Sequence, residues 1–223
     1  MSIFLKTYLI KMKLHNPFVA VFIIILFFSC AASDQQTEKK PPLYTIEQFM
    51  NVERVFGSSF SPDESKILMN SQLSGIYNAY EIDIATGAKT QLTSSTTSAI
   101  YGRSYFPEDE RIIYTSDQEG NEISHIYLRE VNGINTDLTP DSLAKSNYGG
   151  WNHNKTKFYV SSNKRDPKYF DLYTTSIENT SSSESKVFHS EMVYQNDEGY
   201  NVSEVSTNER YFALSKSITT NRT

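Results

Sequence analysis

The chain has 223 residues, of which 38% are hydrophobic and 21% are charged, and its formal net charge is −5. This is the composition of a folded globular protein, and the length suits one or two domains with a sizeable core. Because the lysines and arginines are scattered rather than clustered, the sequence gives little support for nucleic-acid binding. A single cysteine, Cys30, excludes an internal disulfide and a cysteine-based zinc site.

The first 29 residues are predicted to be a signal peptide. Residues 18–28 read FVAVFIIILFF, an unbroken apolar run, and three positive charges precede it, at Lys6, Lys11 and Lys13. A helix that spans a membrane needs about 20 such residues, whereas a run of eleven suits the apolar core of a secretory signal.

The end of this run resembles the cleavage site of a bacterial lipoprotein, in which the cysteine becomes the new N-terminus and carries lipid. Ser29 is followed by Cys30, although Phe27 occupies the position at which such sites prefer leucine. We therefore expect Cys30 to be the lipid attachment site, with an ordinary signal peptide and an incidental cysteine as the alternative. Residues 30–43 are mostly polar and are predicted to form a flexible tether. The chain would then be exported to the bacterial cell envelope, in the periplasm or at the outer membrane.

A short helix is predicted within residues 44–55, YTIEQFMNVERV. Thr45 and Gln48 have the spacing of a capping box. Ile46, Phe49 and Met50 then fall on one side of the helix.

Four similar phrases follow: SFSPDESKILMNS, SYFPEDERIIYTS, GWNHNKTKFYVSS and EVSTNERYFALS. Aligned on a basic residue they are 45, 46 and 53 residues apart, at Lys66, Arg111, Lys157 and Arg210. Two further markers repeat with the same period, a tyrosine (Tyr80, Tyr127 and Tyr173) and a Leu-Thr pair (Leu92-Thr93 and Leu138-Thr139). A period in the forties with several short strands per unit is typical of the blades of a β-propeller.

Each unit is predicted to contain four strands. The first strand ends in an aromatic residue, at Phe60, Tyr105 and Trp151, and a polar turn follows it. Thr86-Gly87 and Asn132-Gly133 supply turns between the third and fourth strands.

The predicted fold class is therefore all-β, an incomplete β-propeller of about three and a half four-stranded blades after a signal peptide and a short helix. The propeller domain would span residues 44–223, with blades at about 57–95, 99–141, 145–191 and 200–223. Blades that have a neighbour on both sides need no strict apolar–polar alternation. We also expect the chain to be the front part of a longer protein, because the fourth unit stops after its second strand.

Residue types that carry catalysis occur without a catalytic pattern. Gly102-Arg103-Ser104 is the nearest approach to the nucleophile motif Gly-x-Ser-x-Gly, but the second glycine is absent. The acidic pairs Asp63-Glu64 and Asp109-Glu110 recur in the same predicted turn, so we expect solvated turn residues.

Outside the signal peptide, the histidines His125, His153 and His189 lie on different predicted elements without metal-ligand spacing, and His153 falls in a turn. The sequence therefore predicts no catalytic residue, no metal site and no cofactor in this chain.

Two segments resemble a known family. Residues 44–68, YTIEQFMNVERVFGSSFSPDESKIL, resemble the start of the propeller in bacterial serine peptidases of the prolyl oligopeptidase family. Residues 161–173, SSNKRDPKYFDLY, are similar to a third-blade segment of the acylaminoacyl-peptidase and dipeptidyl-peptidase-like branch. The likeness extends over residues 44–223, although the turn phrase containing Ser61-Pro62-Asp63 is shared with the periplasmic propeller of the Tol system.

The resemblance implies a propeller of seven or eight blades over a C-terminal α/β-hydrolase domain that carries a Ser-Asp-His triad. No position of this chain matches those catalytic residues. The implied function is the propeller portion of an exported peptidase, which limits access of short peptides to the hydrolase and is held at the membrane by lipid on Cys30. Whether the chain belongs to an enzyme stays open at this point. The alternative is a non-catalytic propeller lipoprotein of the Tol-system type that binds another protein.

Overall fold

The computed structural model describes residues 42–176 and 189–217. The chain divides into two compact units, Met1–Met50 and Asn51–Thr223. Within the described residues, none of the helices is long and apolar enough to cross a membrane. The predicted signal peptide, Cys30 and almost all of the predicted tether lie outside the described residues, so these assignments stay predictions.

The first unit contains α2 (Ile46–Met50), which begins with the predicted capping box. The backbone N–H of Thr45 donates to Gln48 Oε1 at 3.0 Å, and the N–H of Gln48 donates to Thr45 Oγ1 at 3.2 Å. These reciprocal bonds satisfy two N–H groups that the first turn of a helix leaves without partners. The short helix is confirmed.

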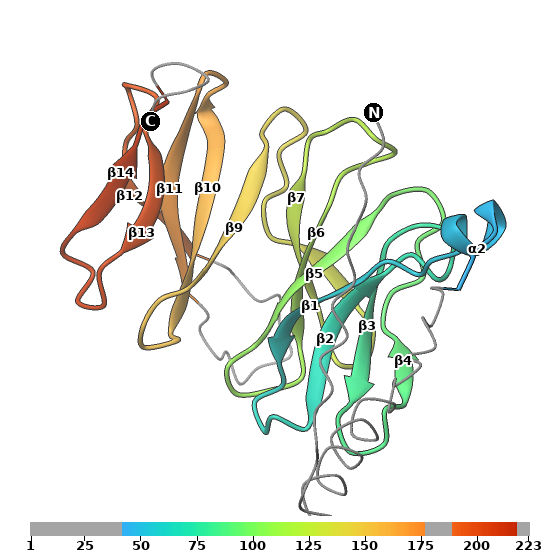
Figure 1. The fold of residues 1–223 in the computed structure, drawn as a ribbon. Coiled ribbons are helices and arrows are strands. Elements are labelled where there is room, and N and C mark those ends of the chain that lie inside the picture. The colour runs from blue at the N-terminus through green and yellow to red at the C-terminus, as the bar shows by residue number, and fades with distance from the viewer. Residues whose placement is uncertain (1–41, 177–188, 218–223) are drawn as a thin grey trace, which may run out of the picture. The chain divides into compact units, whose positions relative to one another are not determined.

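The second unit consists of antiparallel sheets whose strands follow one another in chain order (Figure 1). The first sheet comprises β1 (Val55–Phe60), β2 (Lys66–Ser71), β3 (Asn78–Asp83) and β4 (Lys89–Gln91). The second comprises β5 (Ile100–Tyr105), β6 (Ile112–Ser116), β7 (His125–Arg129) and β8 (Asn135–Asp137). The third comprises β9 (Ser146–Trp151), β10 (Lys157–Asp166), β11 (Tyr169–Ser176) and β12 (His189–Tyr194). A two-stranded sheet follows, made of β13 (Asn201–Val205) and β14 (Phe212–Ser215).

This arrangement confirms the predicted fold class, three four-stranded blades and the start of a fourth. The first strands of the three complete sheets end at Phe60, Tyr105 and Trp151, as predicted. Gly87 and Gly133 adopt φ of +71° and +91° in the turns before β4 and β8, a region that glycine occupies without strain.

The strand β10 continues four residues beyond the end of the third repeated phrase at Ser162. It continues through a bulge after Ser162 and pairs Asp166 with Tyr169, which leaves Pro167 and Lys168 as the hairpin turn. Polar residues extend this strand because the paired strand β11 continues beside them, a contact that periodicity alone does not reveal.

The alignment of the fourth phrase on Arg210 is wrong by one residue. In the same turn of all four units an N–H donates to the carbonyl oxygen of the residue five positions later, and these carbonyl oxygens belong to Lys66, Arg111, Lys157 and Tyr211. Tyr211 is therefore equivalent to Lys66. Arg210 lies in the turn, because the backbone ladder, and not the type of side chain, sets the register.

Two apolar clusters join successive sheets. The first cluster lies between the first and second sheets and contains Leu68, Ala79, Tyr105 and Ile112. The second cluster lies between the second and third sheets and contains Phe106, Ile113, Ile126, Leu128, Phe158, Val160 and Tyr173. Every residue of β6 is buried, whereas nearly all of β1 is exposed. A strand with a neighbouring sheet on both faces has no reason to alternate, as the sequence indicated.

Candidate functional site

The serine of the incomplete nucleophile motif has a structural role. Ser104 is buried, and its Oγ donates to the carbonyl oxygen of Tyr105 at 2.7 Å and accepts a bond from Trp151 Nε1 at 2.9 Å. The adjacent Gly102 pairs with the side chain of Asn70 through both of its backbone groups, at 2.6 and 3.1 Å. The bonds of Asn70 and Trp151 join successive sheets, so Gly102 and Ser104 serve packing.

The acidic turn residues also act locally. Asp63 Oδ1 accepts bonds from the Ser61 hydroxyl at 2.6 Å and the Ser65 N–H at 3.1 Å, and these bonds lower the pKa of Asp63 from 3.8 to about 2. Asp109 accepts from the N–H of Arg111 at 3.0 Å and pairs with its guanidinium at 2.7 Å. Both carboxylates stabilise a turn, as predicted.

The histidines are not brought together among the residues whose side chains the structure describes. His125 is buried, with Nδ1 at 2.7 Å from Asp137 Oδ2 and Nε2 at 2.9 Å from the carbonyl oxygen of Asp141. His153 is exposed in the predicted turn. In the described ranges, no group of three or more His, Cys, Asp or Glu residues could hold a metal ion.

A buried polar position that the sequence analysis missed recurs in the three complete sheets. It lies two residues before the repeated tyrosine and is occupied by Asn78, His125 and Asp171. Each side chain bonds the segment that follows the fourth strand of its own sheet, through Ser95 N–H at 2.8 Å, Asp141 O at 2.9 Å and Asn196 N–H at 2.8 Å respectively. The available signal was a polar residue at a constant distance from the tyrosine. This signal was missed because the residue type at this position differs between the three units.

The Leu-Thr marker has a related role. Thr93 Oγ1 accepts the N–H of Ala79 at 2.9 Å, and Thr139 Oγ1 accepts the N–H of Ile126 at 3.0 Å. Each hydroxyl continues the pairing of the third strand beyond the last residue of the fourth strand. The pair therefore recurs because it anchors the link to the next sheet.

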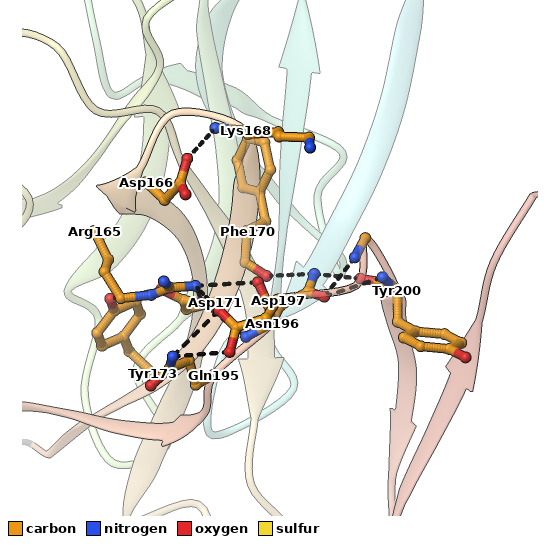
Figure 2. Close-up of polar contacts among 11 residues, drawn as sticks. Arg165, Asp166, Lys168, Phe170, Asp171, Tyr173, Gln195, Asn196, Asp197 and Tyr200 are labelled. Atoms are coloured by element: carbon orange, nitrogen blue, oxygen red, sulfur yellow. Dashed lines mark hydrogen bonds and ion pairs between the residues drawn. The ribbon is translucent and has the colours of Figure 1, made fainter.

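The third sheet carries a polar network centred on Asp171, which is fully buried (Figure 2). Arg165 binds both carboxylate oxygens of Asp171, at 2.7 and 2.9 Å, and also donates to the carbonyl oxygen of Asn196 at 3.0 Å. Burial acts to raise the pKa of Asp171, but the bonds from Arg165 and the N–H of Asn196 outweigh it, and the pKa is lowered. The bonds between Arg165 and Asp171 raise the pKa of Arg165. A bidentate pair of this kind holds its two strands in one geometry.

Asn196 extends this network to the next sheet. Its Oδ1 accepts the N–H groups of Gly199 and Tyr200, both at 3.0 Å, and its Nδ2 donates to the carbonyl oxygens of Phe170 at 3.1 Å and Tyr200 at 2.6 Å. Figure 2 shows these contacts converging between β11 and the start of β13. With all these groups bonded to one another, the network positions the link between blades. It includes Arg165, from the segment that resembles the peptidase family.

The structure also contains an open hollow that sequence reasoning did not find. It has a volume of about 410 Å³ and is lined by the start of β5, the end of β6, the β6–β7 loop and the start of β9. Its lining includes four charged side chains, Arg103, Asp117, Glu122 and Lys145, and two aromatic ones, Tyr101 and Tyr148. The charged and aromatic side chains of this lining could bind a small polar ligand.

The fold is that of known β-propellers. TolB from Acinetobacter baumannii superimposes with a TM-score of 0.54 at 17% identity, over 73% of this chain and 37% of that one. Oligopeptidase B from Trypanosoma brucei, with covalently bound antipain, superimposes with a TM-score of 0.50 at 10% identity, over 68% of this chain and 22% of that one. The chain thus spans well under half the length of these proteins. No family model matches the sequence, and no curated protein matches it. At these identities the likeness shows the fold alone.

Proposed function

We propose that this chain is the N-terminal propeller portion of an exported serine peptidase that hydrolyses short peptides. The propeller would limit access to a C-terminal α/β-hydrolase domain, in which the catalytic serine would lie. The observation that carries this proposal is the segment 161–173, which resembles the peptidase family in sequence. Arg165 and Asp171 of this segment form the network that anchors the link after the third sheet. The fold shared with oligopeptidase B is compatible with it.

A second candidate function is a non-catalytic propeller of the Tol-system type, which binds another protein in the cell envelope. The turn phrase Ser61-Pro62-Asp63, which the Tol-system propeller shares, favours it, and the fold shared with TolB from A. baumannii is compatible with it. The two candidates differ in whether a reactive serine belongs to the same polypeptide.

The experiment that separates them labels serine hydrolases in the native envelope. An epitope tag is inserted into the predicted tether of the native gene, and the envelope fraction is treated with a fluorophosphonate probe. The peptidase proposal expects a tagged polypeptide much larger than 25.5 kDa, the mass of this chain, that carries the probe. A tagged polypeptide that does not react would overturn it and favour the binding module.

We further propose that lipid on Cys30 holds the protein at the membrane. Metabolic labelling with an alkyne fatty acid should mark the native protein, whereas Cys30→Ser should lose both the label and sedimentation with membranes. Unchanged sedimentation of the unlabelled variant would show that the cysteine is incidental.

A further inference from the structure

The hollow between the second and third sheets contains a guanidinium that no carboxylate neutralises. Arg103 Nε donates to Thr115 Oγ1 at 2.9 Å, and its guanidinium carbon lies 5.6 Å from the centre of the Tyr101 ring. Within the described ranges, no carboxylate lies within 4 Å of its nitrogens. The side chain is accessible to solvent, but burial by its surroundings still lowers the pKa of Arg103. A partly desolvated cation that has no carboxylate in direct contact is stabilised by an anion that enters the hollow.

The other charged residues of the lining indicate how many negative charges the bound anion carries. Lys145 adds a second cation, while Asp117 and Glu122 contribute two carboxylates, so the four formal charges cancel. Asp117 Oδ2 also accepts the N–H of Glu122 at 3.2 Å, which keeps this carboxylate engaged with its own loop. A lining without net charge suits a single carboxylate better than a dianionic phosphate. The planar fork of Arg103 matches a carboxylate through two parallel bonds.

Aromatic rings lie directly beside the hollow. Tyr101 belongs to the lining and packs on Tyr77 at 5.3 Å between ring centres, and Tyr77 packs on Phe56 at 5.7 Å. Phe56 is 42% exposed. This row of rings, which we name the aromatic platform (Phe56, Tyr77 and Tyr101), offers an apolar surface within reach of the Arg103 guanidinium.

We propose that the hollow and the aromatic platform together bind the C-terminal end of a short peptide whose last residue is apolar. Arg103 takes the terminal carboxylate, and the platform takes the apolar side chain. The volume of about 410 Å³ falls in the range of about 300–1,000 Å³ that small-ligand sites occupy. The choice of a peptide rests on the proposed function, because both candidate functions involve peptide or protein partners.

The test uses the full 223-residue chain and two probes, the tripeptide Ala-Ala-Phe as a free acid and the same tripeptide with a C-terminal amide. Binding is measured by calorimetric titration at low ionic strength. The parent chain should bind the free acid at least tenfold more tightly than the amide. Arg103→Gln should abolish this difference. Lys168→Gln should retain it, because Lys168 is an exposed cation on the β10–β11 turn outside the hollow.

Circular dichroism establishes that each variant is folded. If Arg103→Gln unfolds, Lys145→Gln takes its place. We expect Lys145→Gln to lose less of the preference for the free acid over the amide. Equal binding of acid and amide would overturn the proposal, as would an equal loss in Lys168→Gln. Displacement of the free acid by inorganic phosphate at matched ionic strength would also overturn it, in favour of a phosphate site. A failed titration alongside a positive serine-probe result would remove this subsite and leave the proposed function standing.

Discussion

At the scale of single residues, one position shows how three side chains perform the same task. Asn78, His125 and Asp171 each bond the link to the next sheet, yet one is a neutral amide, one an imidazole and one a carboxylate. The partners differ accordingly, because a buried polar group must find a complementary one. Asp171 requires Arg165, whereas Asn78 is satisfied by hydroxyl and backbone groups.

The carboxylate of Asp171 should contribute strongly to stability. Asp171→Asn leaves one neutral acceptor oxygen in place of two charged ones, so at least one of the bonds from Arg165 is lost. We expect a loss of about 1.5–3 kcal/mol in the free energy of unfolding by urea. Asp197→Asn is the matched control, because Asp197 also lies 3.0 Å from Arg165 but its side chain is 59% exposed. That variant should lose less than about 1 kcal/mol. Similar losses in both variants would contradict the importance of burial here.

Gly102, in the second sheet, lies against Leu68 and Ala79 of the first sheet. A Cβ added there would lie 3.2 Å from Leu68 Cδ1 and 3.3 Å from Ala79 Cβ, closer than ordinary contact. We therefore expect Gly102→Ala to lower the free energy of unfolding by about 1–3 kcal/mol, measured by urea titration.

The control for this prediction is Gly57→Ala at the equivalent position of β1, where a Cβ would lie 3.5 Å from Ile67. Its stability should stay within about 1 kcal/mol of the parent. Equal effects at the two positions would show that loss of glycine itself, and not the neighbouring sheet, decides the outcome.

At the scale of elements, ion pairs reach from one sheet to the turn of the next. Lys66 pairs with Glu110 at 2.7 Å, and Lys157 pairs with Glu209 at 2.7 Å. The basic residue that marks two of the repeated phrases is therefore a contact between neighbouring units. In the second sheet Arg111 instead pairs with Asp109 of its own turn and stacks over the Phe106 ring at 4.3 Å.

The Leu-Thr pair supplies a test of how a strand is joined to the next unit. Thr93→Val removes the acceptor of the Ala79 N–H, and a buried donor left without a partner costs about 1–3 kcal/mol. Thr93→Ser keeps the hydroxyl and should stay within about 1 kcal/mol of the parent in thermal or urea unfolding. If Val were tolerated as well as Ser, the hydroxyl would have no anchoring role.

At the scale of the whole molecule, acid should destabilise the fold. The pKa of Asp63 is about 2 in the folded state, against an ordinary value of 3.8, so the folded state binds fewer protons between these values. Its contribution is complete above about pH 4 and is lost as the pH falls towards 2. The lowered pKa of Asp171 and of Glu209 adds to the same trend.

Urea midpoints measured between pH 7 and pH 2 test this expectation. The parent should lose stability below about pH 4, and Asp63→Asn should lose less between pH 4 and pH 2, because the titrating group is gone. Parallel pH profiles for the two proteins would show that the turn carboxylate does not contribute to acid sensitivity.

Patterns in the amino-acid sequence predicted most of the strands and turns of this protein. The polar turns after Phe60, Tyr105 and Trp151 and the Thr45–Gln48 cap depend on residues close together along the chain, and the repetition of the phrases indicated a propeller. Local backbone preferences act at that range, so the strands, the turns and the class of fold could be predicted.

Tertiary structure alone decided the register of the last unit, the pairs Lys66–Glu110 and Arg165–Asp171, and the hollow around Arg103. Most of these features join residues from different strands or from successive sheets. Neither a repeat nor a periodic pattern specifies which side chain of one strand meets which side chain of another. The packing of one sheet on the next makes that choice, and with it the surface on which a ligand can bind.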